Sequence, residues 1–229
     1  MNVPTMTIPW LPEGRTLMLP GRGEAFVRVH RHADPAAPWL LLLHGWTASG
    51  DVQFFTAYEA LAQHYSFVAV DHRGHGRGMR TARRFELEDA ADDAAAVVGQ
   101  LGIGPVITIG YSMGGPISLL FAHRHPQLVR AMVVQATALE WRATRFERAR
   151  WKTVRLVGPM MRSWAYPRWL RYGLTKLLGV GHELEAFVPW VEAETRRGDP
   201  LAIVQAGRAL SRYDARPWAG SLGKPAAML

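Results

Sequence analysis

Apolar and polar positions alternate in blocks along the first 136 residues. Short runs rich in Leu, Val and Ile lie at 39–43, 66–70, 106–109 and 129–134. Between these runs, apolar positions recur at helical spacing in 53–64, 85–101 and 113–123. Two further runs, 15–19 and 25–32, flank the turn sequence PGRGE and predict an antiparallel hairpin. Because continuous apolar strands that alternate with helices are typical of parallel sheets, the sequence predicts an α/β fold with a mostly parallel central sheet and helices on both faces.

The pattern changes after residue 139. Strand patterns stop, arginine becomes frequent and six tryptophans appear between Trp141 and Trp218. We therefore predict an α/β core at 1–139, a helical cap insertion at 140–220, and the start of a further core strand at 221–229, where Lys224 precedes the run PAAML. Since the chain ends inside this predicted strand, we expect a fragment that lacks the last strand or strands of its fold. A frayed terminal edge is the other interpretation.

Composition narrows the class of protein. Hydrophobic residues make up 48% of the 229 positions and charged residues 20%, which indicates a globular chain with a sizeable core. There is no cysteine, so thiolate catalysis and Cys-ligated metal sites are excluded. The segment 102–122 has no charge, but its five glycines and two prolines indicate a strand, a turn and a helix rather than a membrane span. The first 15 residues lack the pattern of a secretory signal, so we expect a cytoplasmic protein.

The strongest chemical signal is a G-x-S-x-G motif. Gly110, Ser112 and Gly114 follow the predicted strand 106–109 and open the next helix. A serine at such a sharp turn exposes its hydroxyl above the sheet, and the helix N-terminus favours negative charge that develops there. This context predicts a catalytic nucleophile; the other interpretation is a glycine-lined turn with a structural serine.

Two other segments follow predicted strands and share the same sheet edge. His44-Gly45-Trp46 follows the strand at 39–43, and a backbone N–H there could join that of Met113 to hold an oxyanion. The segment DHRGHGRG follows the strand at 66–70. We interpret it as structural, with Asp71 and Arg73 tying loops together, because charges beside a core strand need partners.

With HGW, DHRGHGRG and GYSMGG in this order, the chain resembles the α/β-hydrolase superfamily, in its serine-nucleophile, esterase- and lipase-like branch. The resemblance covers residues 15–136 well. It implies Ser112 as nucleophile, the amides of Trp46 and Met113 as oxyanion hole, and neither metal nor organic cofactor. The expected function is hydrolysis of a small-molecule carboxylic ester or thioester with an apolar acyl group. The alternative is a truncated, non-catalytic homologue that binds a ligand or partner.

The chain departs from the family at the other two members of the triad. In this fold the acid and then the histidine follow the serine along the chain, so both would lie after Leu229. His123 and His125 lie on the same helix as Ser112 at too great a distance. The remaining candidates are His44, His72, His75 and His182, with Glu140 as an alternative acid. We therefore expect little or no hydrolase activity from the 229 residues.

The net charge of +8 is concentrated in one segment. Residues 142–171 carry nine basic residues against one acid, Glu147. Written as a helix, this segment places Arg145, Arg148, Lys152 and Arg155 on one face and Phe146, Val154, Val157 and Met161 on another, with Arg150 as the exception. One interpretation is weak contact with a membrane surface or an acidic substrate; the other is a solvated cap over the active site. Because no basic motif of known docking geometry occurs, we expect no nucleic-acid partner. The oligomeric state stays open.

Overall fold

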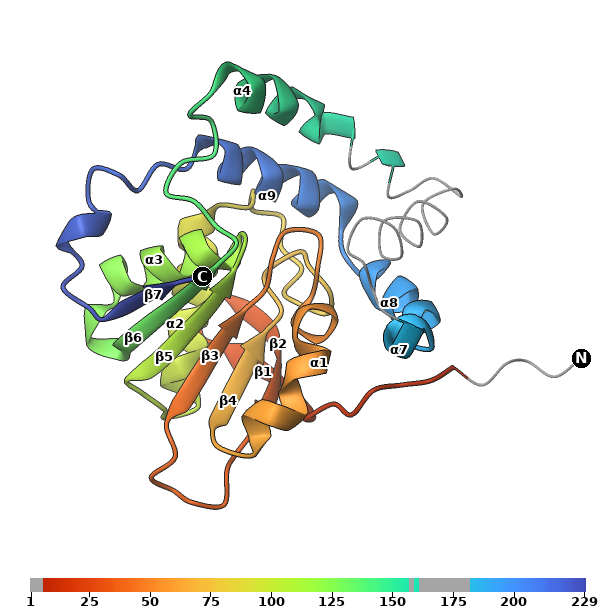
Figure 1. The fold of residues 1–229 in the computed structure, drawn as a ribbon, viewed down its shortest axis with the longest axis vertical. Coiled ribbons are helices and arrows are strands. Elements are labelled where there is room, and N and C mark those ends of the chain that lie inside the picture. Colours follow the sequence, from red (N-terminus) through yellow and green to blue (C-terminus); the bar gives the residue numbers. More distant parts are fainter. Residues whose placement is uncertain (1–5, 157–158, 161–181) are drawn as a thin grey trace, which may run out of the picture.

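A seven-stranded sheet forms the centre of the molecule in the computed structural model, which describes residues 6–156, 159–160 and 182–229 (Figure 1). The strands are β1 (Glu13–Leu19), β2 (Gly23–His30), β3 (Trp39–Leu43), β4 (Ser66–Val70), β5 (Val106–Tyr111), β6 (Val129–Gln135) and β7 (Ala226–Met228). Their order in the sheet is β1-β2-β4-β3-β5-β6-β7. The hairpin β1–β2 is antiparallel and joins β4 in antiparallel fashion, whereas the pairs from β4 to β7 are all parallel. The predicted α/β fold with a mostly parallel sheet is confirmed.

The helices that follow the strands cover both faces of the sheet. They are α1 (Gly50–Ala62), α2 (Leu87–Gln100) and α3 (Gly114–Arg124) in the first part of the chain, then α4 (Arg145–Trp151), α7 (His182–Glu185), α8 (Val188–Thr195) and α9 (Pro200–Arg212). Short 3-10 segments occur at η1 (Pro126–Leu128), η2 (Lys152–Leu156) and η4 (Ala219–Ser221). Figure 1 shows α1 on one side of the sheet and α2 and α3 on the other.

Successive side chains of β3 belong to two different hydrophobic clusters, one on each face of the sheet. Leu40 and Leu42 pack with Phe54 and Tyr58 of α1, while Leu41 and Leu43 belong to the larger cluster formed with α2 and α3. All four leucines are buried, as expected for a strand in the middle of a sheet covered on both sides. The apolar run 39–43 therefore reflects two cores that share one strand.

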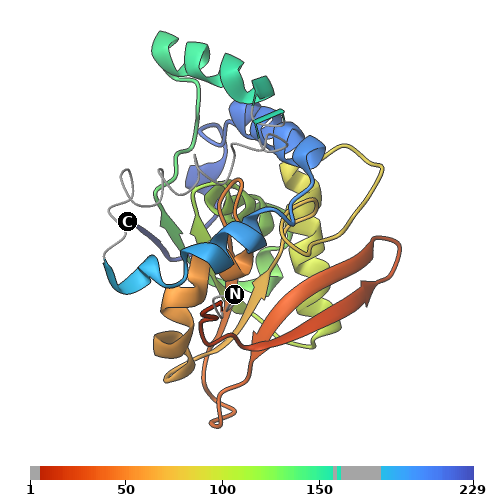
Figure 2. The same cartoon turned by 90° about the vertical axis from the view of Figure 1, so that its right-hand side faces the viewer.

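Helix α9 belongs to the predicted cap segment, yet it packs into the main core. Asp199 caps its N-terminus by accepting hydrogen bonds from the amides of Leu201 and Ala202. Its buried side chains Ala206 and Leu210 join the same hydrophobic cluster as α2 and α3. In both views α9 crosses above the upper end of the sheet, and α4 lies beyond it (Figures 1 and 2). The segment after residue 139 therefore covers the carboxyl ends of the parallel strands.

Several element boundaries differ from those predicted. Helix α1 begins at Gly50 rather than at residue 53, because the Ser49 side chain accepts a hydrogen bond from the amide of Val52 and caps an earlier start. Strands β5 and β6 continue to Tyr111 and Gln135. Strand β7 does form beside β6, but its three residues are exposed at the sheet edge and not buried as predicted.

The basic segment also differs from the predicted amphipathic helix. Helix α4 ends at Trp151 and continues as a 3-10 turn, which changes the faces on which later residues lie. Val154 is buried as predicted, but Phe146, expected on the same apolar face, is 76% exposed. Val157 and Met161 lie outside the described residues. Across the part of the chain that the structure describes, no helix combines the length and apolarity that crossing a membrane requires.

Candidate active site

Ser112 occupies the turn between β5 and α3 in a left-handed backbone conformation, with φ of +51°. Its amide donates a hydrogen bond to the carbonyl of Gln135 over 2.9 Å. Its carbonyl accepts one from the amide of Gly115 and one from the Thr137 hydroxyl, each over 2.9 Å. Bonds to the end of β6 and to the start of α3 therefore hold this strained residue in place.

The two flanking glycines are required by close backbone approach. A Cβ atom on Gly110 would lie 2.3 Å from the carbonyl oxygen of Gly114. A Cβ atom on Gly114 would lie 2.0 Å from the carbonyl oxygen of Leu43 at the end of β3. Both distances are shorter than any real contact, so the sharp turn and its closeness to β3 depend on the missing side chains.

The loop after β3 lies directly against Ser112. A Cβ atom on Gly45 would be 3.4 Å from the Cβ of Ser112, which places the HGW segment beside the serine. The backbone amides of Trp46 and Met113 donate to no acceptor within the described part of the chain. The strand order reverses between β3 and β5, and ligands bind outside the carboxyl ends of strands at such a point. Two unpaired donors and a serine hydroxyl thus meet at this edge.

A cavity of about 290 Å³ opens beside Ser112. Its other lining residues come from the loop after β3 and from the segment after residue 139: Trp46, Trp141, Arg150, Trp151, Thr153, Val154 and Leu210. Indole and aliphatic groups predominate, as in sites for small apolar ligands.

Hydrogen bonds fix the indoles of this cavity. Trp46 Nε1 donates to the carbonyl of Ile203 on α9 over 2.8 Å, and Trp151 Nε1 donates to the carbonyl of Trp141 over 2.6 Å. The Trp151 ring centroid lies 5.8 Å from that of Trp46 and 6.0 Å from that of Trp141. The indole nitrogen of Trp141 is buried without a hydrogen-bond partner among the described residues. The walls are therefore preorganised by contacts with α9 and within the segment 141–151.

Three buried histidines, His44, His72 and His75, lie near this edge, and none of them is hydrogen-bonded to Ser112 among the described residues; both ring nitrogens of His72 and Nε2 of His75 have no partner there. His44 Nε2 accepts the amide N–H of His72 over 3.0 Å, so its Nδ1 carries the proton and donates to the carbonyl of Gly45 over 2.8 Å. Both nitrogens of His44 are thus engaged. Burial lowers the pKa of His44 well below its usual value, that of His72 to about 3 and that of His75 to about 4. No group of three or more His, Asp or Glu side chains is arranged to hold a metal ion within the described ranges.

None of the other predicted partners contacts Ser112 either. His125 Nε2 lies 2.8 Å from Asp92, and the ring of His123 lies against Trp218. Glu140 forms an ion pair of 2.6 Å with Arg216. The side chain of His182 lies outside the described residues. Among the side chains that the structure describes, no base or acid is hydrogen-bonded to the Ser112 hydroxyl.

The DHRGHGRG segment has the structural role that its position suggested. Asp71 accepts the amides of Gly50 and Arg77, each over 2.7 Å, and burial raises its pKa to about 6. Arg73 holds Asp93 of α2 through two hydrogen bonds of 2.7 and 2.8 Å. These contacts fasten the loop after β4 to α1 and α2.

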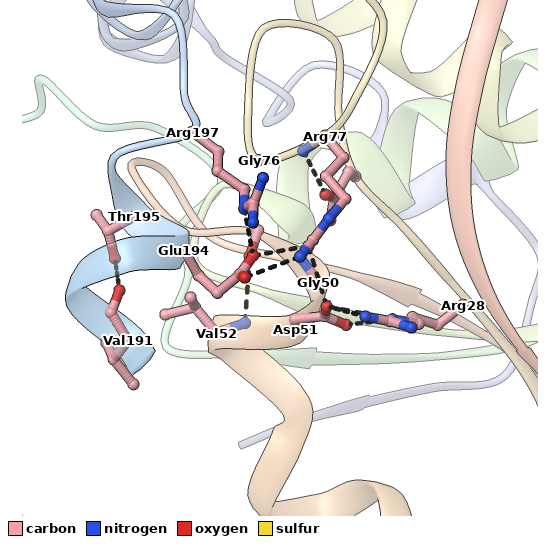
Figure 3. Close-up of polar contacts among 12 residues, drawn as sticks. Arg28, Gly50, Asp51, Val52, Gly76, Arg77, Val191, Glu194, Thr195 and Arg197 are labelled. Atoms are coloured by element: carbon pink, nitrogen blue, oxygen red, sulfur yellow. Dashed lines mark hydrogen bonds and ion pairs between the residues drawn. The ribbon is translucent and has the colours of Figure 1, made fainter. Parts of the chain in front are cut away.

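A chain of charges that no sequence motif indicated connects α8 to the core (Figure 3). Arg77 lies 3.2 Å from Asp51 and 2.7 Å from Glu194 of α8. Asp51 also pairs with Arg28 of β2, and Glu194 with Arg197. Both carboxylates are almost fully buried, so their neutralisation by arginines is needed for α8 to lie against α1. The sequence did not indicate this network, because Arg77 and Glu194 are more than 100 positions apart.

Comparison with known proteins agrees with the fold. Residues 38–155 match the family model of the alpha/beta hydrolase fold, and the chain belongs to that family. The 2-(acetamidomethylene)succinate hydrolase of Mesorhizobium japonicum is 35% identical over 98 residues, 43% of this chain and 35% of that protein. A bifunctional esterase/perhydrolase of Acinetobacter calcoaceticus is 32% identical over 102 residues, 44% of this chain and 37% of that protein. The matched segments thus span little more than a third of these relatives.

Solved structures show the same architecture over more of the chain. An esterase from Exiguobacterium antarcticum superposes with a TM-score of 0.77 at 20% identity, covering 94% of this chain and 80% of the esterase. An enol-lactonase from Burkholderia xenovorans gives a TM-score of 0.72 at 19% identity, with 93% and 80% covered. At this level of identity the likeness concerns the fold alone.

Proposed function

We propose that this chain carries the nucleophile and oxyanion hole of a serine hydrolase that acts on a small ester or thioester with an apolar acyl group. Ser112 is the nucleophile, and the amides of Trp46 and Met113 bind the oxyanion. Residues 140–220 act as a cap over a core at 1–139, with 221–229 as a core strand. The observation that carries the proposal is a conformationally strained serine, with φ of +51°, that lines a cavity and is accompanied by two amides, those of Trp46 and Met113, without an acceptor among the described residues.

The proposed chemistry begins with attack of Ser112 Oγ on the substrate carbonyl carbon. The serine proton passes to a base, and the carbonyl oxygen becomes negative as the tetrahedral intermediate forms. The amides of Trp46 and Met113 would then donate to this oxygen, helped by the N-terminus of α3. Collapse of the intermediate expels the alcohol or thiol and leaves an acyl group on the serine, which water removes.

The substrate class follows from the cavity and from the relatives. Three indoles and two aliphatic side chains favour an apolar acyl or leaving group, and about 290 Å³ suits a small molecule. The names of the relatives specify hydrolysis of a substituted succinate, of esters and, for a protein of Agrobacterium fabrum, of carbamate. Hydrolysis of a small molecule is what these names have in common, and the esterase name supports the ester part of the proposal.

Acylation of Ser112 tests the proposal directly. The full chain is incubated with p-nitrophenyl butyrate, and the adduct is located by intact mass and peptide mapping. Because no described base contacts the serine, we expect slow accumulation of a butyryl group on the peptide that contains Ser112 during prolonged incubation. We expect none in Ser112→Ala and an unchanged adduct in Ser211→Ala, which alters a serine whose hydroxyl donates to the carbonyl of Arg208 on α9. An adduct that persists in Ser112→Ala contradicts the proposal. Failure to acylate, together with binding of butyrate esters in the cavity, favours the non-catalytic alternative.

A further inference from the structure

One wall of the cavity beside Ser112 carries a positive charge that forms no ion pair with any carboxylate in the described part of the chain. Arg150, in the last turn of α4, lines this cavity together with Ser112, Trp151 and Val154. Its side chain is exposed, and no described carboxylate lies within ion-pair distance of its guanidinium group. The Thr153 hydroxyl donates to the backbone carbonyl of Arg150 over 2.7 Å, a contact that does not involve the guanidinium group.

The rest of α4 offsets this charge only in part: hydrogen bonds from Thr144 and then the nearby charge of Arg150 lower the pKa of Glu147, but no ion pair joins the two side chains among the described residues. Glu147 is the one acid of the helix, and its carboxylate accepts the amide and hydroxyl of Thr144 in a capping box. Arg145 and Lys152 add positive charge on either side of Arg150 and have no ion-pair partner in the described ranges. The electrostatic potential at this side of the cavity is therefore positive.

The C-terminal end of a helix favours basic residues, which explains why an arginine occurs in the last turn of α4. It does not explain why the Arg150 side chain lines the cavity. Arg148, from the same turn, directs its guanidinium to the carbonyls of Arg142 and Ala143 over 3.0 and 3.1 Å. Among the residues that the structure describes, no backbone carbonyl accepts a hydrogen bond from the Arg150 guanidinium. The two arginines thus differ in what they contact: one is bound to the chain, and the other borders the space beside the serine.

We infer that Arg150 pairs with a carboxylate on the substrate, whose apolar part lies among the indoles of Trp46, Trp141 and Trp151. This inference rests on the proposed function and names its substrate class: a small ester or thioester that carries one negative charge. A guanidinium group donates two parallel hydrogen bonds to a carboxylate, and the apolar walls beside it exclude water that would weaken the pair. The carboxylate belongs either to the acyl part or to the leaving group.

Binding measured without turnover tests the inference. In the Ser112→Ala background, tryptophan fluorescence and calorimetry compare 4-phenylbutyrate with its neutral amide, which differ in charge and hardly in shape. We expect the carboxylate to bind about fivefold to tenfold more tightly. Arg150→Gln abolishes this preference and leaves affinity for the amide unchanged, whereas Arg150→Lys keeps part of it. Arg145→Gln, a control that removes an equally exposed charge from α4 outside the cavity, keeps the preference.

Two results would overturn the inference. One is equal affinity for carboxylate and amide in the Ser112→Ala protein. The other is an equal loss of preference in Arg145→Gln, which would reduce Arg150 to one of several diffuse charges. A third pattern would assign the charge to a membrane surface instead. In that pattern the protein binds phosphatidylglycerol vesicles, Arg150→Gln and Arg145→Gln weaken this binding equally, and the protein binds 4-phenylbutyrate and its amide with equal affinity.

Two further experiments determine which part of the substrate carries the carboxylate and test this inference separately from the hydrolase proposal. Monophenyl succinate carries its charge on the acyl side and 4-acetoxybenzoate on the leaving group; the ester whose binding Arg150→Gln weakens identifies the side. The butyryl adduct formed by the unaltered chain from a neutral ester reports on Ser112 independently of charge. If the protein prefers the carboxylate but forms no butyryl adduct, the anion site is supported and the hydrolase proposal is contradicted. If it forms the adduct but shows no preference, the hydrolase proposal is supported and the anion site is contradicted.

Discussion

Gly207 on α9 leaves the space that the indole of Trp46 occupies. A Cβ atom on Gly207 would lie 2.5 Å from Cζ2 of Trp46 and 2.7 Å from Cγ1 of Val154. Trp46 also donates to the carbonyl of Ile203, one turn earlier on α9. Gly207, in the segment after residue 139, therefore sets the position of Trp46, whose amide we propose for the oxyanion hole.

Gly207→Ala is expected to displace Trp46 and Val154, because the ring is hydrogen-bonded to α9 and cannot move freely. We expect a loss of about 1–3 kcal/mol in the free energy of unfolding, typical of overpacking, and a shift in tryptophan emission. Gly99→Ala is the matched control: this helical glycine on α2 has nothing within 4 Å of its Cβ position. There we expect a gain of about 0.5–1 kcal/mol from helix propensity. Similar gains at both sites, measured by urea unfolding, would contradict the steric interpretation.

Slow turnover is expected from the 229-residue chain. A positioned general base contributes about 10²–10⁴-fold to catalysis, and none contacts the Ser112 hydroxyl among the described side chains. Initial rates of p-nitrophenyl butyrate hydrolysis should therefore lie close to those of Ser112→Ala. Rapid turnover that Ser112→Ala abolishes would show that a base reaches the serine after all.

Buried His75 is expected to make the fold sensitive to acid. Burial lowers the pKa of His75 to about 4, while the unfolded chain protonates near 6.5, so the unfolded state binds more protons between these values. Stability contributed by the neutral ring is fully present above pH 6.5 and is lost as the pH falls toward 4. His75→Asn keeps a donor near the carbonyl of Arg73, to which Nδ1 is bonded, and removes the titration.

Urea unfolding at pH 7.5 and pH 5 measures this effect. The difference in unfolding free energy between the two pH values should shrink by about 1–2 kcal/mol in His75→Asn, since one pH unit corresponds to about 1.4 kcal/mol per proton. His64→Asn, at an exposed position, is the control and should leave the difference unchanged. Asp71 has the opposite effect on the free energy of unfolding. Burial raises its pKa to about 6, so protonation of its buried carboxylate stabilises the fold as the pH falls. An unaltered pH dependence in His75→Asn would exclude the histidine as the source.

Two bidentate arginine pairs on α2 should differ in their contribution to stability. Arg73 holds Asp93 with its side chain only 5% exposed, whereas Arg124 holds Asp92 with 41% of its side chain exposed. Arg73→Lys removes one of the two hydrogen bonds that Arg73 donates to the buried Asp93 carboxylate, which Arg22 also contacts, and we expect a loss of about 1–3 kcal/mol. Arg124→Lys should change the unfolding free energy by less than about 0.5 kcal/mol. Equal losses in thermal or urea unfolding would contradict the role of burial.

The sequence by itself determined the sheet and the turn that presents Ser112. The strand and helix types followed from the periodicity of apolar residues, a signal that depends only on residues close together in the sequence. The bounds of β3 and β4 were predicted to the residue. The glycines around Ser112 indicated a sharp turn because only a residue without a side chain fits such close backbone contacts. Boundaries were less accurate, as at α1, where a serine cap outweighed the spacing of apolar residues.

Only the tertiary structure decided what surrounds that serine. Helical spacing placed Phe146 on the apolar face and treated Arg150 as an exception, but Phe146 is 76% exposed and Arg150 lines the cavity. The contacts of Trp46 with Gly207 and of Arg77 with Glu194 join positions more than 100 residues apart. Periodicity reports which face of an element is buried, not which distant element covers it, so the composition of the site depends on packing between segments.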